Sequence, residues 1–398
     1  MLKNRGRTGR KRRRKQSRSF SLHAVNHSQR LEYIQLKKWL KERGYEDSKL
    51  RLVQFPETGR GLMTTKALQA GELIISLPEK CILTTDIVLN SYLGEYIAKW
   101  RPPISPLMAL CTFLIAEKYS GEQSLWKSYL DVLPKTYSCL VCWEQEVLKL
   151  LPEPLRSKAE KQRRVVQELY ISSKSFFSCL QPLFTEDVAT VFNYDAMQWA
   201  WCTINTRTVY MKHSQRECFS REPDVYALAP FLDLLNHSPN VKVKASFNEK
   251  TRCYEILTVS PCRKYEEVFI CYGPHDNQRL LLEYGFVAID NPHSSVYVST
   301  DTLLKHPFPA DKQRNMKLSI LKDHDFLENL TFGWYGPSWR LLTALKLLCL
   351  EADEYTCWKK VLLGYIISDR NEKKSLAQTT KICLSLIEET QHVLQKVT

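Results

Sequence analysis

The sequence has no hydrophobic run long enough to cross a lipid bilayer. A membrane-spanning helix needs about 20 consecutive apolar residues. The longest candidates are Leu107–Ala116 and Leu341–Leu350, and Lys346 interrupts the second. The first residues are basic and polar and lack the apolar core of a secretory signal peptide. We therefore expect no membrane partner and no secretory signal.

The spacing of a zinc site is also missing. Of 13 cysteines, only Cys139 and Cys142 form a CxxC pair, and no second pair follows at zinc spacing. In a chain without a secretory signal, cysteines are more typical of reduced thiols than of a disulfide framework. We expect free thiols and no metal ion.

Acidic residues are absent from the first 20 positions, which hold ten lysines and arginines. Taking these ten from the net charge of +14 leaves +4 for the remaining 378 residues. Residues 1–28 are predicted to form a basic disordered tail, because such a segment has little apolar surface to bury. The run Lys11–Lys15 is typical of nuclear import or nucleic-acid contact, which makes importin or nucleic acid a partner. A merely solvated tail is the alternative.

Hydrophobic periodicity places strands and helices in separate blocks. In chain order, we expect a helix over Leu31–Arg43, short strands between Leu52 and Thr85, a helix over Leu107–Tyr119 opened by Ser105 and Pro106, helices near 155–185 and 194–211, a hairpin of Val241–Phe247 and Cys253–Val259, a strand at Val268–Tyr272, and helices near 338–351, 357–367 and 374–396. Because the strands cluster, alternating βα layers are disfavoured. The sequence predicts a mixed α+β protein: a split β-rich domain, a long helical insertion and an all-helical C-terminal domain.

Two segments place polar groups at turns. Glu57–Leu62 contains a Gly-x-Gly turn, where the backbone can approach a ligand without Cβ atoms in the way; a turn with no ligand is the alternative. The apolar run Ala229–Leu235 ends abruptly in the donors and acceptors of Asn236, His237 and Ser238, which an Asx turn would also explain. His237 is not placed as a metal ligand, because no second His or Cys lies two to five residues further on.

A third segment carries two tyrosines at the ends of predicted elements. Tyr272 ends the short strand within Glu266–Pro274, and Tyr284 ends the helix within Leu280–Val287. Two core or capping aromatics would fit the same pattern. Each of the three segments is ambiguous alone, and their order and combination are more specific.

Taken together, the three segments resemble the SET-domain methyltransferases. The helical insertion and helical C-terminal region are similar to the class of Rubisco large-subunit methyltransferase, and differ from histone-directed members that carry a cysteine-rich zinc region. The resemblance covers roughly residues 30–390. It implies a SET domain with a pseudoknot over 29–290, an insertion at about 100–225, and a substrate-binding domain over 300–398.

The resemblance also implies roles for particular residues. Tyr272 matches the catalytic tyrosine of the family. Residues matching the binding site for the cofactor S-adenosylmethionine are Arg30, Thr58, Gly59, Arg60, Arg207, Asp233, Asn236, His237, Tyr284, Gly285 and Phe286. The last three match the wall beside the target amine.

The implied activity is methyl transfer from S-adenosylmethionine to a lysine of another protein. The expected substrates are histone tails and non-histone proteins of the nucleus and cytosol, and the expected state is a monomer. A histidine acceptor is the alternative among enzymes, since a relative of this architecture methylates histidine. Outside enzymes, the alternative is a non-catalytic module that reads peptides or nucleic acid. Retention of Tyr272, Asn236 and the glycine turn favours the enzyme.

Overall fold

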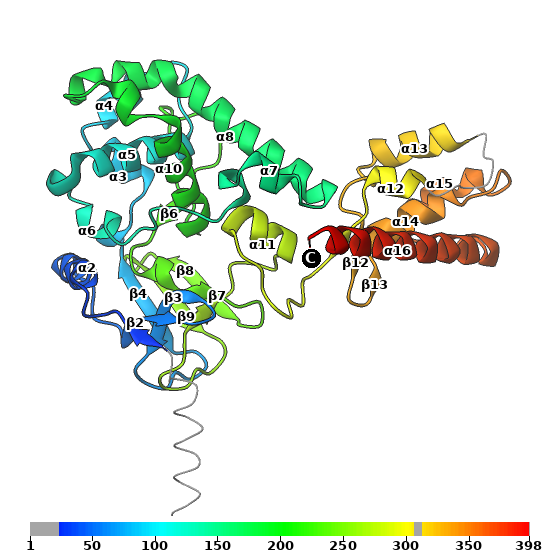
Figure 1. Ribbon diagram of the computed structural model, residues 1–398, viewed down its shortest axis with the longest axis horizontal. Helices are drawn as coiled ribbons and strands as arrows, with labels where there is room; N and C mark the ends of the chain where they lie inside the picture. The colour runs from blue at the N-terminus through cyan, green and yellow to red at the C-terminus, as the bar shows by residue number, and fades with distance from the viewer. Residues whose placement is uncertain (1–23, 306–312, 398) are drawn as a thin grey trace, which may run out of the picture. The chain divides into compact units, whose positions relative to one another are not determined.

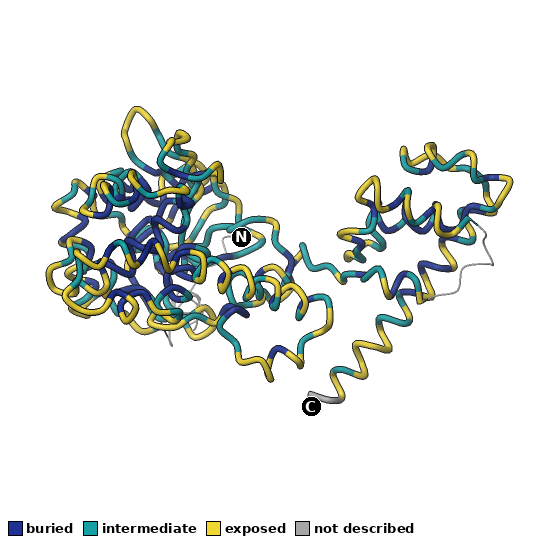
Figure 2. Tube along the Cα trace, turned by 90° about the horizontal axis from the view of Figure 1, so that it is seen from above, coloured by how far each residue is buried: buried dark blue, intermediate teal, exposed yellow. Residues whose placement is uncertain are grey.

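The computed structural model describes residues 24–305 and 313–397 (Figure 1). The first of two compact units contains the described residues up to Cys142, Lys161–Pro274 and Glu283–Phe286. The second contains Trp143–Glu160, His275–Leu282 and the described residues from Val287 onward. Each unit has a hydrophobic core of its own, drawn dark blue in Figure 2. The basic run Lys11–Lys15 lies outside the described residues.

The strands of the first unit form short, mostly antiparallel sheets. One sheet has the order β1-β2-β3, a second β4-β9-β8, and a third pairs β5 with β6; β7 pairs with β10 in parallel. The strands are β1 (Val25–Asn26), β2 (Leu50–Phe55), β3 (Gly59–Thr64), β4 (Leu73–Pro78), β5 (Thr208–Tyr210), β6 (Tyr226–Leu228), β7 (Asn236–His237), β8 (Val243–Asn248), β9 (Cys253–Thr258) and β10 (Phe269–Ile270). The expected β8–β9 hairpin is confirmed.

Strand β1 corrects the predicted extent of the tail. Val25 and Asn26 pair with Gln54 and Val53 of β2, and the His27 amide donates to Leu52 O at 3.2 Å. Residues 24–28 therefore belong to the folded chain and not to a disordered tail. This strand was not predicted, because two residues are too few to show an alternating pattern.

Among the described residues of the first unit, the longer helices were predicted and the short ones of four to six residues were not. The helices are α2 (Leu31–Glu42), α3 (Thr85–Leu89), α4 (Gly94–Lys99), α5 (Pro106–Ser120), α6 (Lys127–Leu130), α9 (Val188–Val191) and α10 (Tyr194–Arg207), with 3-10 turns η1 (Glu79–Cys81), η2 (Gly121–Gln123), η3 (Leu140–Cys142), η4 (Gln181–Leu183) and η5 (Leu232–Leu234). Helices α8 (Glu153–Cys179) and α11 (Asn277–Tyr284) contribute residues to both units.

Side-chain caps explain where two of these helices begin. Ser105 Oγ accepts from Met108 N at 3.1 Å at the start of α5, and Asn193 Oδ1 accepts from Ala196 N at 2.9 Å at the start of α10. Such caps satisfy amides that have no partner inside the helix. The helix expected over 194–211 ends at Arg207 instead, because the chain turns extended at Thr208 and pairs as β5.

The second unit contains helices and one small sheet. The helices are α7 (Gln145–Leu148), α12 (Thr300–Lys305), α13 (Arg314–Asp323), α14 (Trp339–Leu348), α15 (Trp358–Leu362) and α16 (Asp369–Val397), with the 3-10 turn η6 (Tyr355–Cys357). The sheet is β11 (Val296–Tyr297), β12 (Thr331–Gly333) and β13 (Gly336–Pro337). No helix in the described parts of the chain has the length and apolar character of a membrane span.

The prediction of an all-helical C-terminal domain is therefore wrong in one detail. β12 and β13 form a tight antiparallel hairpin in which Gly336 adopts a φ of +123°, a conformation open mainly to glycine. The strands are too short to stand out from a turn in the sequence. The predicted helix after Ser338 is confirmed, since Ser338 Oγ accepts from Leu341 N at 3.3 Å at the start of α14.

Three distant segments of the first unit lie side by side. Val268 N donates to Leu62 O at 2.7 Å, which joins the segment before β10 to β3. On the other side, Ser238 N donates to Ile270 O at 2.9 Å, which continues the β7–β10 pair. The glycine turn, the Asn-His pair and the strand before Tyr272 thus converge, and they frame the candidate site.

Candidate active site

The glycine turn leads from β2 into β3 and allows close approach by other groups. Gly59 has a φ of +74°, so it takes the left-handed conformation that favours glycine. At Gly61, a Cβ atom would lie 2.3 Å from Glu267 Oε1 and 2.8 Å from Asn236 Nδ2. A side chain at position 61 would therefore force the hydrogen-bonded ends of Glu267 and Asn236 to move.

The side chains of Asn236 and Glu267 hold this turn in place by hydrogen bonds. The Asn236 amide donates to Arg60 O at 2.9 Å, to Thr58 O at 3.4 Å and to Glu267 Oε1 at 2.7 Å. Glu267 Oε2 accepts from the Thr58 hydroxyl at 2.6 Å. Burial raises the pKa of Glu267, and the hydrogen bonds from Thr58 and Asn236 partly offset this effect. The result is a cluster of carbonyl and carboxylate oxygens at one point.

Glu267 was not among the predicted site residues. The only signal in the sequence is the adjacent pair Glu266-Glu267 before β10. Glu266 accepts instead from Arg263 N at 3.0 Å and points away from the turn. The sequence could not show which of the two carboxylates faces Asn236.

Four rings form an aromatic cluster beside this turn. The His237 ring lies 5.1 Å from that of Tyr272 and 6.0 Å from that of Phe286, and Tyr272 lies 5.1 Å from Tyr284. His237 Nδ1 accepts from Tyr272 N at 3.0 Å, and the Tyr272 hydroxyl donates to Leu235 O at 2.8 Å. Burial raises the pKa of Tyr272 well above its ordinary value, so the hydroxyl keeps its proton and can donate.

The end of α11 holds Tyr284 and Phe286 in this cluster. Gly285 adopts a φ of +77°, and a Cβ there would lie 2.4 Å from the carbonyl carbon of Ser138. The carbonyl oxygen of Glu283 accepts from Asn205 Nδ2 at 2.8 Å and from the Cys139 thiol at 3.4 Å. The backbone is therefore fixed on both sides of Tyr284.

Arg207 and Asp233 form a buried ion pair next to the rings. Arg207 Nη1 lies 3.2 Å from Asp233 Oδ2, which also accepts from the Tyr129 hydroxyl at 3.0 Å. Burial opposes the charge on Arg207, but the Asp233 carboxylate raises the pKa of the guanidinium, which therefore stays protonated. The two opposite charges of the pair therefore largely cancel.

The side chains of two predicted arginines contact other residues, although the Arg60 carbonyl belongs to the oxygen cluster. Arg60 Nη1 donates to the Tyr33 hydroxyl at 3.0 Å and to Val132 O at 2.8 Å, so its side chain joins α2 to the insertion. Arg30 precedes α2 and forms a 3.9 Å ion pair with Glu32 while its side chain is 58% exposed. No hydrogen bond or ion pair between described residues joins Arg30 to the aromatic cluster.

A cavity of about 280 Å³ opens beside Tyr272. Its walls come from β5, β8, β9 and β10 and from the end of α11, and its lining includes Arg207, Leu235, Tyr254, Tyr272 and Tyr284. The Tyr272 hydroxyl and its acceptor, Leu235 O, belong to residues that both face this space. The cavity can therefore accept a mostly apolar side chain whose polar end lies near the Tyr272 hydroxyl.

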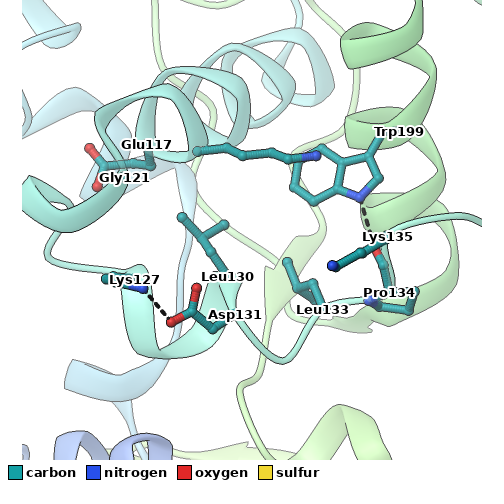
Figure 3. A pocket seen from close by; sticks show the side chains of 10 residues that line it. Glu117, Gly121, Lys127, Leu130, Asp131, Leu133, Pro134, Lys135 and Trp199 are labelled. Atoms are coloured by element: carbon teal, nitrogen blue, oxygen red, sulfur yellow. Dashed lines mark hydrogen bonds and ion pairs between the residues drawn. The ribbon is translucent and has the colours of Figure 1, made fainter. Parts of the chain in front are cut away.

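A different cavity of the same unit, of about 220 Å³, is shown in Figure 3. There the Lys118 ammonium lies 3.7 Å from the centre of the Trp199 ring, and Trp199 Nε1 donates to Pro134 O at 2.9 Å. Lys127 pairs with Asp131 at 2.6 Å. The described lining contains none of the predicted site residues, so this cavity is not the candidate active site.

The structure thus brings most of the predicted residues together. Thr58, Gly59 and Asn236 meet at the glycine turn, and His237, Tyr272, Tyr284 and Phe286 form the aromatic cluster, with Gly285 between the last two. Tyr272, Tyr284, Arg207 and Asp233 line the cavity. Their chemical roles stay predictions. Among the described residues, no three His, Cys, Asp or Glu side chains are arranged to hold a metal ion.

The class of protein follows from comparison with known families. The SET domain family matches residues 59–273, and the Rubisco LSMT substrate-binding family matches residues 308–396. The chain belongs to the SET-domain family. Its sequence is 64% identical to SET domain-containing protein 4 of Mus musculus, over 100% of this chain and 90% of that protein.

The names of more distant relatives specify different residue types as the target of methylation. The ribosomal lysine N-methyltransferase set11 of Schizosaccharomyces pombe is 25% identical over 79% of this chain and 74% of its own length. The actin-histidine N-methyltransferase of Homo sapiens is 26% identical over 84% of this chain and 55% of its own length. Among solved structures, the SET domain of LSMT bound to lysine and AdoHcy has the same fold, with a TM-score of 0.63, 18% identity, and coverage of 92% of this chain and 82% of that one.

Proposed function

We propose that this protein transfers a methyl group from S-adenosylmethionine to the side-chain amine of a lysine in another protein. The observation that carries the proposal is one juxtaposition: Asn236, at the oxygen cluster, is followed by His237, whose ring lies 5.1 Å from that of Tyr272 in the lining of an aromatic cavity. The cofactor can bind at the oxygen cluster, and the acceptor side chain can enter the cavity, so that the two meet near Tyr272.

The oxygen cluster suits the amino-acid end of the cofactor. A positively charged ammonium requires acceptors, and the carbonyl oxygens of Thr58 and Arg60 lie with the Glu267 carboxylate around Asn236. The absence of a Cβ at Gly61 lets the side chains of Glu267 and Asn236 approach the backbone of the turn closely, which brings these oxygens together. His237 and Phe286 would lie against the adenine. When bound, S-adenosylmethionine supplies a methyl group on a positively charged sulfur.

The cavity suits an amine that must lose its proton before it reacts. A lysine side chain with a pKa near 10.4 costs about 4 kcal/mol to neutralise at pH 7.4. Desolvation between Tyr254, Tyr272 and Tyr284 lowers that cost, and the proton can leave to solvent. Because Arg207 and Asp233 neutralise each other, they neither repel the amine nor hold it charged. Tyr272 then orients the amine by its hydroxyl.

Lysine is preferred over histidine because of the lining of the cavity. Val209, Ile256 and Tyr254 offer apolar contacts along its length, which suit the four-carbon stem of lysine. An imidazole is shorter and needs a partner for its second nitrogen. The named relatives include both a lysine and a histidine enzyme at nearly equal identity, so the choice is left to experiment.

The same proposal extends to substrates and location. We infer that the protein acts on histone tails and on non-histone proteins, as a monomer, in the nucleus and cytosol. The support is the basic run Lys11–Lys15 for nuclear entry, together with the match to a Rubisco LSMT substrate-binding domain, which favours targets beyond histones.

The direct test is transfer of labelled methyl groups from S-adenosylmethionine into a cell extract, with and without the purified protein. We expect label in a small number of proteins, recovered after complete hydrolysis as methyl-lysine. Recovery as methyl-histidine would replace the proposed acceptor. Cofactor binding with no labelled protein in nuclear or cytosolic extract would favour the non-catalytic module instead.

A further inference from the structure

Three thiols meet in the first unit, apart from the cofactor site. Cys139 and Cys142 are the only CxxC pair of the sequence; Cys139 directly precedes the turn η3, and Cys142 is its last residue. Cys202 lies on α10, and its sulfur is 3.5 Å from that of Cys142. Cys139 and Cys202 are buried, whereas Cys142 is partly exposed.

The segment that carries the CxxC pair is held along α10 by side chains of that helix. Trp199 Nε1 donates to Pro134 O at 2.9 Å, and Gln198 Nε2 donates to Val141 O at 3.0 Å. Between them, the hydroxyls of Tyr137 and Thr203 are 2.9 Å apart. These bonds hold the segment just before Cys142 against α10 on both sides of Cys202, and they keep the two sulfur atoms close together.

Cys142 faces a cavity through which a small oxidant can arrive. The cavity has a volume of about 480 Å³, and its lining includes Cys142, Arg163, Tyr170, Lys174 and Tyr194. The hydrogen bond with Cys202 lowers the pKa of Cys142, and the charge of Arg163 lowers it further against the effect of burial. A partly exposed thiol next to positive charge is the kind that peroxides oxidise.

Cys139 is the less suitable partner of Cys142. Its thiol already donates to Glu283 O at 3.4 Å. Burial does not distinguish it from Cys202, because both side chains are 0% exposed. A metal site does not explain the cluster, because no three candidate ligands among the described residues have a metal-binding arrangement. The pair with a short sulfur–sulfur distance and access from a cavity is Cys142 with Cys202.

We propose that Cys142 and Cys202 form a reversible disulfide when the protein meets hydrogen peroxide. The Cys142 thiolate attacks one peroxide oxygen, the O–O bond breaks and hydroxide leaves, which gives a sulfenic acid. The Cys202 sulfur then attacks the sulfenic sulfur, and water leaves with the Cys202 proton. Two thiols and one hydrogen peroxide give one disulfide and two waters. The sulfurs must approach from 3.5 Å to about 2.05 Å.

The link would act on the wall of the candidate active site. Asn205 lies three residues after Cys202 on α10, on the same side of the helix, and its amide holds Glu283 O just before Tyr284. If the disulfide draws Cys202 toward Cys142, Asn205 moves with it on α10. The hydrogen bond from Asn205 to Glu283 O, which positions Tyr284, is then displaced. We expect transfer to fall on the order of 10-fold, since small misplacements in a site are costly. This consequence rests on the proposed methyl transfer, whereas the disulfide does not.

The test uses the full chain, fully reduced and then titrated with hydrogen peroxide. Remaining thiols are blocked, and a non-reducing digest is mapped by mass spectrometry. We expect a cross-linked peptide pair containing Cys142 and Cys202 that disappears with dithiothreitol. In Cys202→Ser, a sulfenic acid should persist at Cys142 and be trapped by dimedone. Methyl transfer is assayed on the same samples before and after reduction.

Cys179→Ser provides the matched control. Cys179 is also partly exposed, but burial raises its pKa, so this variant should form the Cys142–Cys202 link as the parent does. A map in which Cys142 links to Cys139, or stays reduced while other cysteines are oxidised, would overturn the proposal. A disulfide that leaves transfer unchanged would contradict only its effect on the site.

Discussion

At the scale of the residue, Glu267 connects two parts of the candidate cofactor site. One carboxylate oxygen accepts from Asn236 and the other from Thr58, so a single side chain spans the glycine turn and β7. Burial raises its pKa above the ordinary value of 4.5. Its protonation therefore changes in a pH range where the unfolded chain is already ionised.

This shift predicts two opposite pH effects. As the pH falls into that range, Glu267 takes up a proton, and the affinity for S-adenosylmethionine should fall because the carboxylate is lost. In the same range the folded state binds more protons than the unfolded state, so Glu267 makes the free energy of unfolding decrease as pH rises. Glu267→Gln should remove both effects and raise KM for the cofactor on the order of 10-fold, the worth of a charged hydrogen bond.

Glu266→Gln is the control for this prediction. Glu266 is the adjacent carboxylate, but its side chain accepts from the Arg263 backbone and forms an ion pair with the Arg263 side chain. Cofactor KM and thermal unfolding are measured for both variants between pH 4.5 and 8. If the two variants had the same cofactor KM and the same pH dependence of unfolding, the Glu267 carboxylate would not contribute to cofactor binding.

At the scale of the element, the end of α11 depends on one glycine. Gly285→Ala would place a Cβ 2.4 Å from Ser138 backbone in a left-handed conformation, so Tyr284 and Phe286 must move. The expected result is a lower Tm and a loss of methyl transfer per folded molecule. Gly44→Ala is the matched control, because Gly44 has a φ of +88° with nothing within 4 Å of the new Cβ.

The control separates strain from displacement. Both substitutions carry the strain of a left-handed alanine, about 1–2 kcal/mol, but only Gly285→Ala also collides with its neighbours. Melting curves and single-turnover transfer on both proteins make the comparison. If Gly285→Ala lost no more activity than Gly44→Ala, the end of α11 would not position the site.

How far the sequence predicts these elements depends on their length. The helices after Ser105 and Ser338 and the β8–β9 hairpin are confirmed, because caps and alternation act locally. β1 and β12 were not predicted, since two or three residues carry no periodic signal.

The candidate site shows a related limit. Single positions such as Tyr272 and Asn236 could be named from a family resemblance, and the structure places them together. Glu267 could not, because its importance comes from contacts across more than 200 residues of chain to Thr58. Arg30 shows the reverse case, since its predicted role gains no support from any contact among described residues.

At the scale of the whole molecule, the basic excess is concentrated in the first 20 residues. Deleting residues 2–18 removes ten positive charges and lowers the net charge from +14 to +4. Transfer to a short peptide should stay nearly unchanged, because the deleted residues precede the matched SET domain at 59–273. Nuclear accumulation should fall, and so should salt-sensitive nucleic-acid binding.

These effects are measured by peptide methylation, by imaging of the tagged protein in cells, and by nucleic-acid binding at several salt concentrations. Loss of peptide methylation would make the tail part of the catalytic unit. Unchanged nuclear accumulation would assign the tail to the solvated alternative.

We propose that the Tyr272 hydroxyl takes part in methyl transfer, and the substitution Tyr272→Phe tests this role. The change keeps the ring beside His237 and Tyr284 and removes only the hydroxyl that donates to Leu235 O. A hydrogen bond involving a developing charge is worth roughly 1.5–3 kcal/mol, so turnover should fall about 10- to 100-fold. Turnover and Tm are measured on one preparation, with transfer confirmed in the parent. We predict slow turnover with a nearly normal Tm. Normal turnover with a lowered Tm would contradict the claim and make Tyr272 a packing residue.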